Sequence, residues 1–275
     1  MKKSNYLKVA LIAIIIPFFA NSSFAQGAYF NLNVGYGLGI GSSFEDFYNE
    51  TDGSNSTTYE KSYVALGKGL NFGGDIGFMF NKNIGAELGI SYLLGGSSKA
   101  KDEYNNGTTD YKIKSRMLRF IPSIVVSTGL ENVTPFAKFG IVVGTGSLKT
   151  EIEDNDDGDV MIIKEKYKGG MAFGFKAAVG AIMNLSDMLS FYIDINTINA
   201  AYAPKKSEIT EYTYKGEDKL PDLNTYQKET EYVKEYTYNP SSTPSDTQPR
   251  QALIEKYPMQ SFGINAGVIL KFGGK

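Results

Sequence analysis

The chain has 275 residues and a formal net charge of −2, and it contains no cysteine, histidine or tryptophan. The missing cysteine excludes disulfides, thiolate metal sites and a cysteine nucleophile. The missing histidine excludes Ser-His catalysis and histidine-metal sites. Only 42% of the residues are hydrophobic, which excludes a bundle of membrane helices, because each helix needs ~20 mostly apolar residues. A chain of this length fits a single β-barrel domain.

Residues 1–25 have the pattern of a secretory signal peptide. Lys2, Lys3 and Lys8 precede an apolar run over 9–20, and this run is too short to span a bilayer as a helix. Small residues end the segment, so we predict cleavage between Ala25 and Gln26. The mature domain, residues 26–275, is then acidic and lacks the basic surface that binding of nucleic acid requires.

Eight later segments alternate large apolar residues with small or polar ones. In the first segment the even positions from Ala28 to Ile40 are apolar, and the odd positions are mostly Gly or Asn. A period of two over such lengths predicts β-strands. The segments are 28–41, 70–80, 84–92, 118–126, 133–144, 171–180, 189–196 and 262–272.

The composition of the two faces predicts which face points inward. Glycine weakens a solvated strand, but it suits a narrow lumen in which side chains from every strand converge. The short connections 81–83, 128–132 and 184–188 alternate with long polar ones, which is typical of outer-membrane barrels. We therefore predict an all-β fold: an eight-stranded antiparallel up-and-down transmembrane β-barrel with short periplasmic turns, long extracellular loops and its apolar face toward lipid.

Particular segments also resemble a known family. The Gly- and aromatic-rich first strand, the segments RFIPSIVVSTG and TPFAKFG, and a last strand ending at Phe272 are similar to the small OmpA-like outer-membrane β-barrel proteins, over residues 27–272. The resemblance implies location in the bacterial outer membrane, with its lipid as a partner. It implies the fold more strongly than the function, because this family hosts structural, adhesive and transport roles.

The third long connection contains the acidic run EIEDNDDGD. Its residues 153–158 loosely match the start of a calcium loop, but the twelfth position is Lys164, where a bidentate Glu is needed. A solvated hairpin tip at Asp157 and Gly158 is the preferred interpretation. Weak binding of a divalent ion at 153–159 is the alternative, and neither a metal site nor a cofactor is predicted.

The fourth long connection, about residues 203–260, holds six of the nine prolines. Its near-copies 211–214 and 235–238, both Glu-Tyr-Thr-Tyr, suggest a hairpin that extends the sheet above the membrane. Exposed tyrosines among mixed charges suit contact with an extracellular or cell-surface partner.

Six charged residues are expected inside the lumen. Three acids and three bases in so narrow a space predict one paired network that plugs the lumen; the alternative is separate solvation of each group by water. Diagonal neighbours on one face of a hairpin lie ~7–8 Å apart. Counting back from the short turns predicts these diagonals: Asp75 with Glu87, Arg119 with Lys138, and Lys176 with Asp194.

These features together predict a non-enzymatic integral outer-membrane barrel with a plugged polar lumen, and a structural or surface-interaction role through its long acidic and tyrosine-rich loops. The alternative is a narrow channel for small solutes. Eight strands favour the plug, because side chains can fill that interior, whereas open pores use ~16 strands or more. A third class, an enzyme built on Ser123 and Lys138, is disfavoured because only chance proximity supports it.

Overall fold

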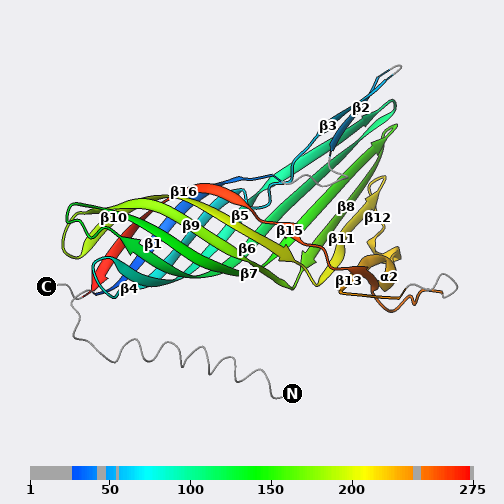
Figure 1. Cartoon of the computed structure of the whole chain (residues 1–275). Coiled ribbons are helices and arrows are strands. Elements are labelled where there is room, and N and C mark those ends of the chain that lie inside the picture. The colour runs from blue at the N-terminus through cyan, green and yellow to red at the C-terminus, as the bar shows by residue number, and fades with distance from the viewer. Residues whose placement is uncertain (1–26, 42–47, 54–55, 238–242, 273–275) are drawn as a thin grey trace, which may run out of the picture.

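The computed structural model describes residues 27–41, 48–53, 56–237 and 243–272, which fold mainly into strands (Figure 1). The predicted cleavage site, Ala25 and Gln26, lies outside the described residues and stays a prediction. In the part of the chain that is described, no helix has the length and the apolar character needed to cross a membrane.

Eight strands pair side by side in a closed ring (Figure 1). Each ring strand pairs antiparallel with the next, and the first pairs antiparallel with the last. Closure gives each strand a partner on both edges. In ring order the strands are β1 (Ala28–Gly39), β4 (Gly69–Met79), β5 (Ile84–Tyr104), β6 (Gly107–Ser127), β7 (Val133–Asp156), β9 (Met171–Asn184), β10 (Leu189–Ala203) and β16 (Ser261–Phe272).

The ring strands expose one face and bury the other, because successive side chains of a strand point to opposite sides. Leu32, Ile76 and Val268 are 57%, 64% and 42% exposed. On the opposite face Asn31 and Glu87 are buried. The apolar positions of the alternating segments thus point outward, as the sequence predicts, while the inward face carries small and polar side chains together with buried apolar ones such as Met117.

Short connections join the ring strands at one end. They span residues 80–83, 128–132 and 185–188. In the first, Oδ1 of Asn81 accepts hydrogen bonds from the backbone N–H groups of Asn83 and Ile84, which closes the turn with a side chain in place of a backbone carbonyl. We call this end of the ring the short-turn end.

At the other end of the ring, which we call the long-loop end, strands continue where the sequence predicted polar loops. β5 and β6 are 21 residues long each and form one hairpin with Asn105 and Asn106 between them. Beyond the apolar segments, polar side chains pair across strands, such as Lys112 with Glu151 at 3.5 Å. Cross-strand pairs of this kind stabilise a solvated ladder, and a search for apolar alternation does not detect them.

β7 changes its partner along its length. It pairs with β9 over Val133–Gly144 and with β8 (Asp159–Lys168) over Ser147–Asp156. Asp157 and Gly158, both at positive φ, make the tip of the β7–β8 hairpin, as predicted.

The chain returns from β8 to the ring through Gly169 and Gly170, both at positive φ. A Cβ at position 170 would lie 1.8 Å from the carbonyl oxygen of Ala203. This turn therefore requires glycine for both its backbone conformation and its close approach to the neighbouring strand.

The remaining elements extend the sheet beyond the ring. β2 (Tyr48–Asp52) and β3 (Thr57–Lys61) form a hairpin beside β5, with β3 at the edge of the sheet. The elements of the fourth long connection are β11 (Lys206–Tyr214), β12 (Glu217–Asp218), η2 (Leu220–Asp222), α2 (Thr225–Lys228), β13 (Glu229–Val233), β14 (Arg250–Leu253) and β15 (Tyr257–Pro258).

The predicted hairpin between 211–214 and 235–238 is wrong. Glu211–Tyr214 of β11 pairs with β8, and Glu235–Thr237 lies outside any strand, while Tyr238 is outside the described residues. β7 already pairs with one edge of β8. The other edge of β8 offers β11 a ladder of eight residue pairs. A preformed edge is a better template than a segment without a strand partner, because only one of the two strands then has to be ordered.

Side chains fill much of the ring in three tiers. The buried apolar tier at the long-loop end includes Leu66, Leu93 and Met117, and the sequence did not predict it. Aromatic residues gather at the short-turn end, and charged and amide side chains lie between these tiers. The aromatic tier consists of Tyr29, Phe136 and Tyr192 with Ile269.

Two segments outside the ring strands turn back into the mouth at the long-loop end. Ser115 Oγ donates to the carbonyl of Leu66 at 2.5 Å, and Met259 donates its N–H to the carbonyl of Ala200 at 2.8 Å. Leu66 and Met259 are both buried. These returning segments complete the apolar tier and close that end of the interior.

Candidate functional site

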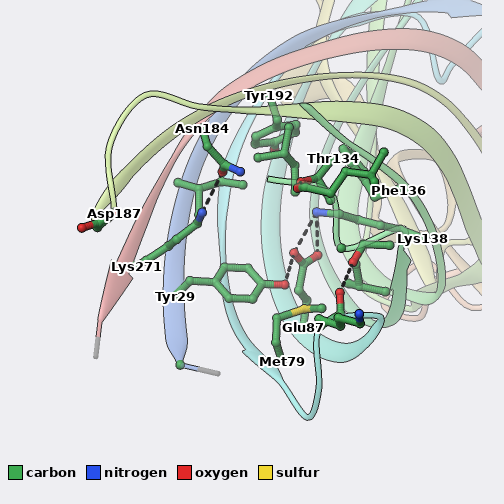
Figure 2. A pocket seen from close by; sticks show the side chains of 18 of the residues that line it. Tyr29, Met79, Glu87, Thr134, Phe136, Lys138, Asn184, Asp187, Tyr192 and Lys271 are labelled. Atoms are coloured by element: carbon green, nitrogen blue, oxygen red, sulfur yellow. Dashed lines mark hydrogen bonds and ion pairs between the residues drawn. The ribbon is translucent and has the colours of Figure 1, made fainter. Parts of the chain in front are cut away.

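An ion pair joins β7 and β5 across the interior of the ring (Figure 2). Lys138 Nζ lies 2.8 Å from each carboxylate oxygen of Glu87, and Tyr29 Oη donates to Glu87 Oε1 at 2.7 Å. The same ammonium lies 5.1 and 5.2 Å from the ring centroids of Phe136 and Tyr192. The pair thus has the hydrogen bonds and the cation–π contacts that buried ions need to offset their desolvation.

The two aspartates of the lumen are held by asparagine amides. Asn33 Nδ2 donates to Asp75 at 3.2 Å, while Asn196 and Asn265 donate to Asp194 Oδ1 at 2.9 and 3.2 Å. Asp75, Asp194 and Lys176 also line one small cavity of about 10 Å³ together with Glu87 and Lys138. Its size is close to that of one water molecule, so five of the six predicted residues lie around one point.

The strand register decides which predicted diagonals exist. Asp75 and Glu87 are diagonal neighbours, as predicted. The predicted Lys176–Asp194 diagonal is wrong, because Lys176 lies four residues from Gly180, the partner of Asp194. The predicted Arg119–Lys138 diagonal is wrong, because Ser127 pairs with Phe136 and this offset carries the two residues six positions apart. The opposed pairs are Gly77 with Glu87, Gly180 with Asp194, Gly144 with Arg119, and Val125 with Lys138.

Arg119 is buried on a different set of partners. Its guanidinium donates to Ser91 Oγ at 3.0 Å and to Asn71 Oδ1. These neutral acceptors on β5 and β4 hold it just below the apolar tier. Of the six predicted lumen residues, all of which are described, only Glu87 and Lys138 form an ion pair with each other.

A cavity of about 300 Å³ opens between the ion pair and the short turns (Figure 2). Lys138, Glu87 and Tyr29 lie at its inner end, and Lys82 and Lys271 lie at its outer end. The sequence analysis did not predict this cavity, although apolar residues at inward positions near the short turns could have indicated it. The apolar residues that line it include Met79, Val125, Leu130, Ile182 and Ile269.

Outside the ring, three tyrosines form a cluster between β8, β13 and β15. The ring of Tyr167 stacks on Tyr232 at 6.1 Å and meets Tyr257 edge-on at 5.7 Å. Tyr167 donates to Glu165 at 2.8 Å. Burial, and then the neighbouring Glu165 carboxylate, raise the pKa of Tyr167 far above its ordinary value. The cluster ties the fourth connection to the third.

Side chains of the acidic segment 153–159 form hydrogen bonds at the hairpin tips. Asp154 Oδ1 accepts from Tyr104 at 3.0 Å and from Thr109 at 2.6 Å, and Asn155 caps the turn through the N–H of Gly158. Within the described ranges, no three acidic side chains are grouped so that they could hold a metal ion. The acidic run therefore makes contacts within the sheet.

The sequence matches the family model of the outer membrane protein beta-barrel domain over residues 11–226. The chain belongs to this family. It is accordingly a protein of the bacterial outer membrane and lies in the lipid of that membrane. The outward apolar face of the ring is the surface that lipid requires.

Solved structures similar to this outer-membrane protein share little sequence with it. Neisserial surface protein A (NspA) is 11% identical, with 90% of this chain and 99% of NspA covered and a TM-score of 0.34. Ail, the attachment invasion locus protein of Yersinia pestis, is 10% identical, with 90% and 100% covered and a TM-score of 0.29. A Pseudomonas aeruginosa FadL homologue is 9% identical, with 91% of both chains covered and a TM-score of 0.23. No curated protein matches the chain.

Proposed function

We propose that this protein is a non-enzymatic outer-membrane barrel with a plugged lumen, and that its role is structural or one of surface interaction through its long loops. The eight ring strands cross the membrane, with the short turns in the periplasm and the extended hairpins outside. The observation that carries the proposal is the filled interior, with an apolar tier above the buried Glu87–Lys138 pair.

The number of ring strands supports the plug. An eight-stranded ring leaves an interior that side chains can just fill. Here Leu66, Met117 and Val142 are at most 2% exposed inside it, and the charged tier follows directly below. A solute would have to displace a close-packed apolar tier before it reached the polar groups, which favours the plug over the narrow channel.

The sheet beyond the ring supports a role at the cell surface. β3 is exposed along its whole length and ends the sheet. Partly exposed ion pairs cross neighbouring strands, such as Lys164–Glu211 at 2.9 Å and Lys168–Glu208 at 2.5 Å. A rigid polar sheet that carries tyrosines suits contact with an extracellular partner.

The arrangement of Ser123 and Lys138 argues against an enzyme. Lys138 Nζ donates to Glu87, and Ser123 Oγ donates to the carbonyl of Ile121 at 3.3 Å. A nucleophilic serine needs its base within hydrogen-bond reach, and both groups here are engaged elsewhere.

Cell fractionation followed by gel electrophoresis tests the proposal. The mature protein should fractionate with the outer membrane, and its unheated form should migrate differently from its boiled form, because a closed ring satisfies its backbone hydrogen bonds and resists detergent. Recovery from the soluble periplasm, or a single band with and without boiling, would refute the closed membrane ring.

A further inference from the structure

The tier at the short-turn end does not fill the ring. The cavity there has a volume of about 300 Å³, which is at the lower end of the range for small-molecule sites, ~300–1,000 Å³. It is bounded by side chains of several ring strands and by the turns at 80–83 and 128–132. A space of this size at the open end of a ring is accessible to a small ligand.

The side walls of this cavity are mostly apolar. Val125 and Ile269 are buried there, on the inward face of the ring. Ile182 and Met79 complete the walls and pack against the aromatic tier. Walls of this kind favour an apolar occupant, because water gains few hydrogen bonds from them.

The inner end of the cavity offers no net charge to a ligand. Both oxygens of Glu87 contact Lys138, and Tyr29 donates to one of them (Figure 2). A ligand headgroup that approached from inside would have to break this buried pair, which is costly. The charged end of an amphipathic ligand therefore belongs at the outer end.

The outer end is positively charged. Lys271 is half-buried there, and its ammonium donates to the neutral Asn184 Oδ1 at 2.7 Å, so this contact leaves its charge uncompensated. Lys82 lines the same rim from the first short turn. Asp187 also lines the rim and its carboxylate interacts electrostatically with Lys271. This carboxylate points away from the cavity in Figure 2, and it offsets only one of the two lysine charges.

We infer that this cavity binds a single-chain amphiphile with an anionic headgroup, its alkyl chain between the apolar walls and its headgroup at Lys271 and Lys82. The ligand class follows from apolar walls, a neutralised inner end and a cationic rim. This site goes beyond the proposed surface role, and it needs only the ring and its short turns, whichever way the protein faces in the membrane.

Binding of decanoate to the full mature protein in nanodiscs, measured by isothermal titration calorimetry, tests the inference. Decanoate should bind at one site per chain, and decyltrimethylammonium should bind about tenfold more weakly, because it lacks the charge-assisted hydrogen bond to Lys271. Equal or tighter binding of the cationic amphiphile would overturn the headgroup assignment.

Two variants and a matched control locate the site. Lys271→Gln should weaken decanoate binding about tenfold and leave binding of decanol unchanged, whereas Lys149→Gln, the same charge change on the exposed part of β7, should alter neither. Ile182→Trp should abolish binding of both ligands by filling the cavity, and its heat-shifted gel band confirms that it folds.

Three results would overturn the site. One is wild-type protein that binds no decanoate beyond empty nanodiscs. Another is undiminished binding by folded Ile182→Trp, which would indicate partition into lipid. The last is an equal loss in Lys271→Gln and Lys149→Gln, which would indicate a general effect of charge.

Discussion

At the scale of single residues, the lumen combines large side chains with glycines on neighbouring strands. Tyr29 reaches Glu87 because Gly77 on β4 leaves room for its ring: a Cβ at position 77 would lie 2.2 Å from Tyr29 Cζ. Gly267 makes the same room for Tyr192, whose ring would lie 2.6 Å from an added Cβ. The glycines of the inward face thus allow aromatic side chains to surround the Glu87–Lys138 pair.

Removing one member of this ion pair should destabilise the protein strongly. Lys138→Met leaves the Glu87 carboxylate buried without its cation, so we expect the free energy of unfolding to fall by ~3–5 kcal/mol. The double variant Lys138→Met with Glu87→Gln should regain part of the loss, because no uncompensated charge remains. Urea unfolding in detergent measures all the variants.

The exposed pair Lys101–Glu103 provides the control. Its side chains are 44% and 46% exposed, so Lys101→Met should cost at most ~1 kcal/mol.

Arg119→Ala and Glu87→Gln should have additive effects on the free energy of unfolding, since Arg119 contacts Ser91 and Asn71 instead of Glu87. A double variant of Lys138 and Glu87 with purely additive losses would contradict the proposed pairing.

At the scale of elements, each ring strand meets two different environments along its two faces. In β16, Val268 is 42% exposed and Ile269 is 5% exposed, so neighbouring residues lie on opposite sides of the ring wall. Val268 is flanked by Leu32 of β1 and Phe191 of β10. Three adjacent strands therefore present one continuous apolar surface, which is the surface that lipid covers.

A charge on this surface should be costly in a membrane. Val268→Arg places a cation near the middle of a lipid-facing strand, and we expect the free energy of unfolding in lipid to fall by ~2–4 kcal/mol. Thr58→Arg on the exposed strand β3 is the control and should change the stability by less than ~0.5 kcal/mol. If Val268→Arg unfolds at the same urea concentration as the wild type, the two faces have been assigned the wrong way round.

At the scale of the whole molecule, different groups block the lumen at the long-loop end and at its middle, while the short-turn end is open. Returning segments and apolar side chains close the long-loop end, and the Glu87–Lys138 tier closes the interior above the cavity at the short-turn end. Above the ring the strands continue as a polar sheet that holds the third and fourth connections together (Figure 1). The ring and the sheet beyond it are thus built on the same long strands.

A plugged lumen should not conduct ions. Purified protein, shown to be folded by its heat-shifted gel band, should give no large steady conductance in a planar bilayer, because the apolar tier and the ion pair occupy the path of an ion. A steady conductance in most insertions would favour the narrow-channel alternative over the plug.

The sequence by itself determined the ring strands and their two faces, because a period of two is a local property of each segment and survives any error in how strands are paired. It also brought Asp75, Glu87, Lys138, Lys176 and Asp194 to the inward face, and the structure gathers these five around one small cavity. Only the tertiary structure decided the partner of Arg119, since register depends on how the residues of a connection divide between two strands.

The apolar tier, the hairpins beyond the ring and the cavity at the short-turn end were also decided by tertiary structure. Leu66 and Met259 are buried because their segments turn back into the ring, and Glu211–Tyr214 pairs with β8 because that edge is already in place. Each of these features depends on contacts between residues far apart in the chain, which no local pattern encodes.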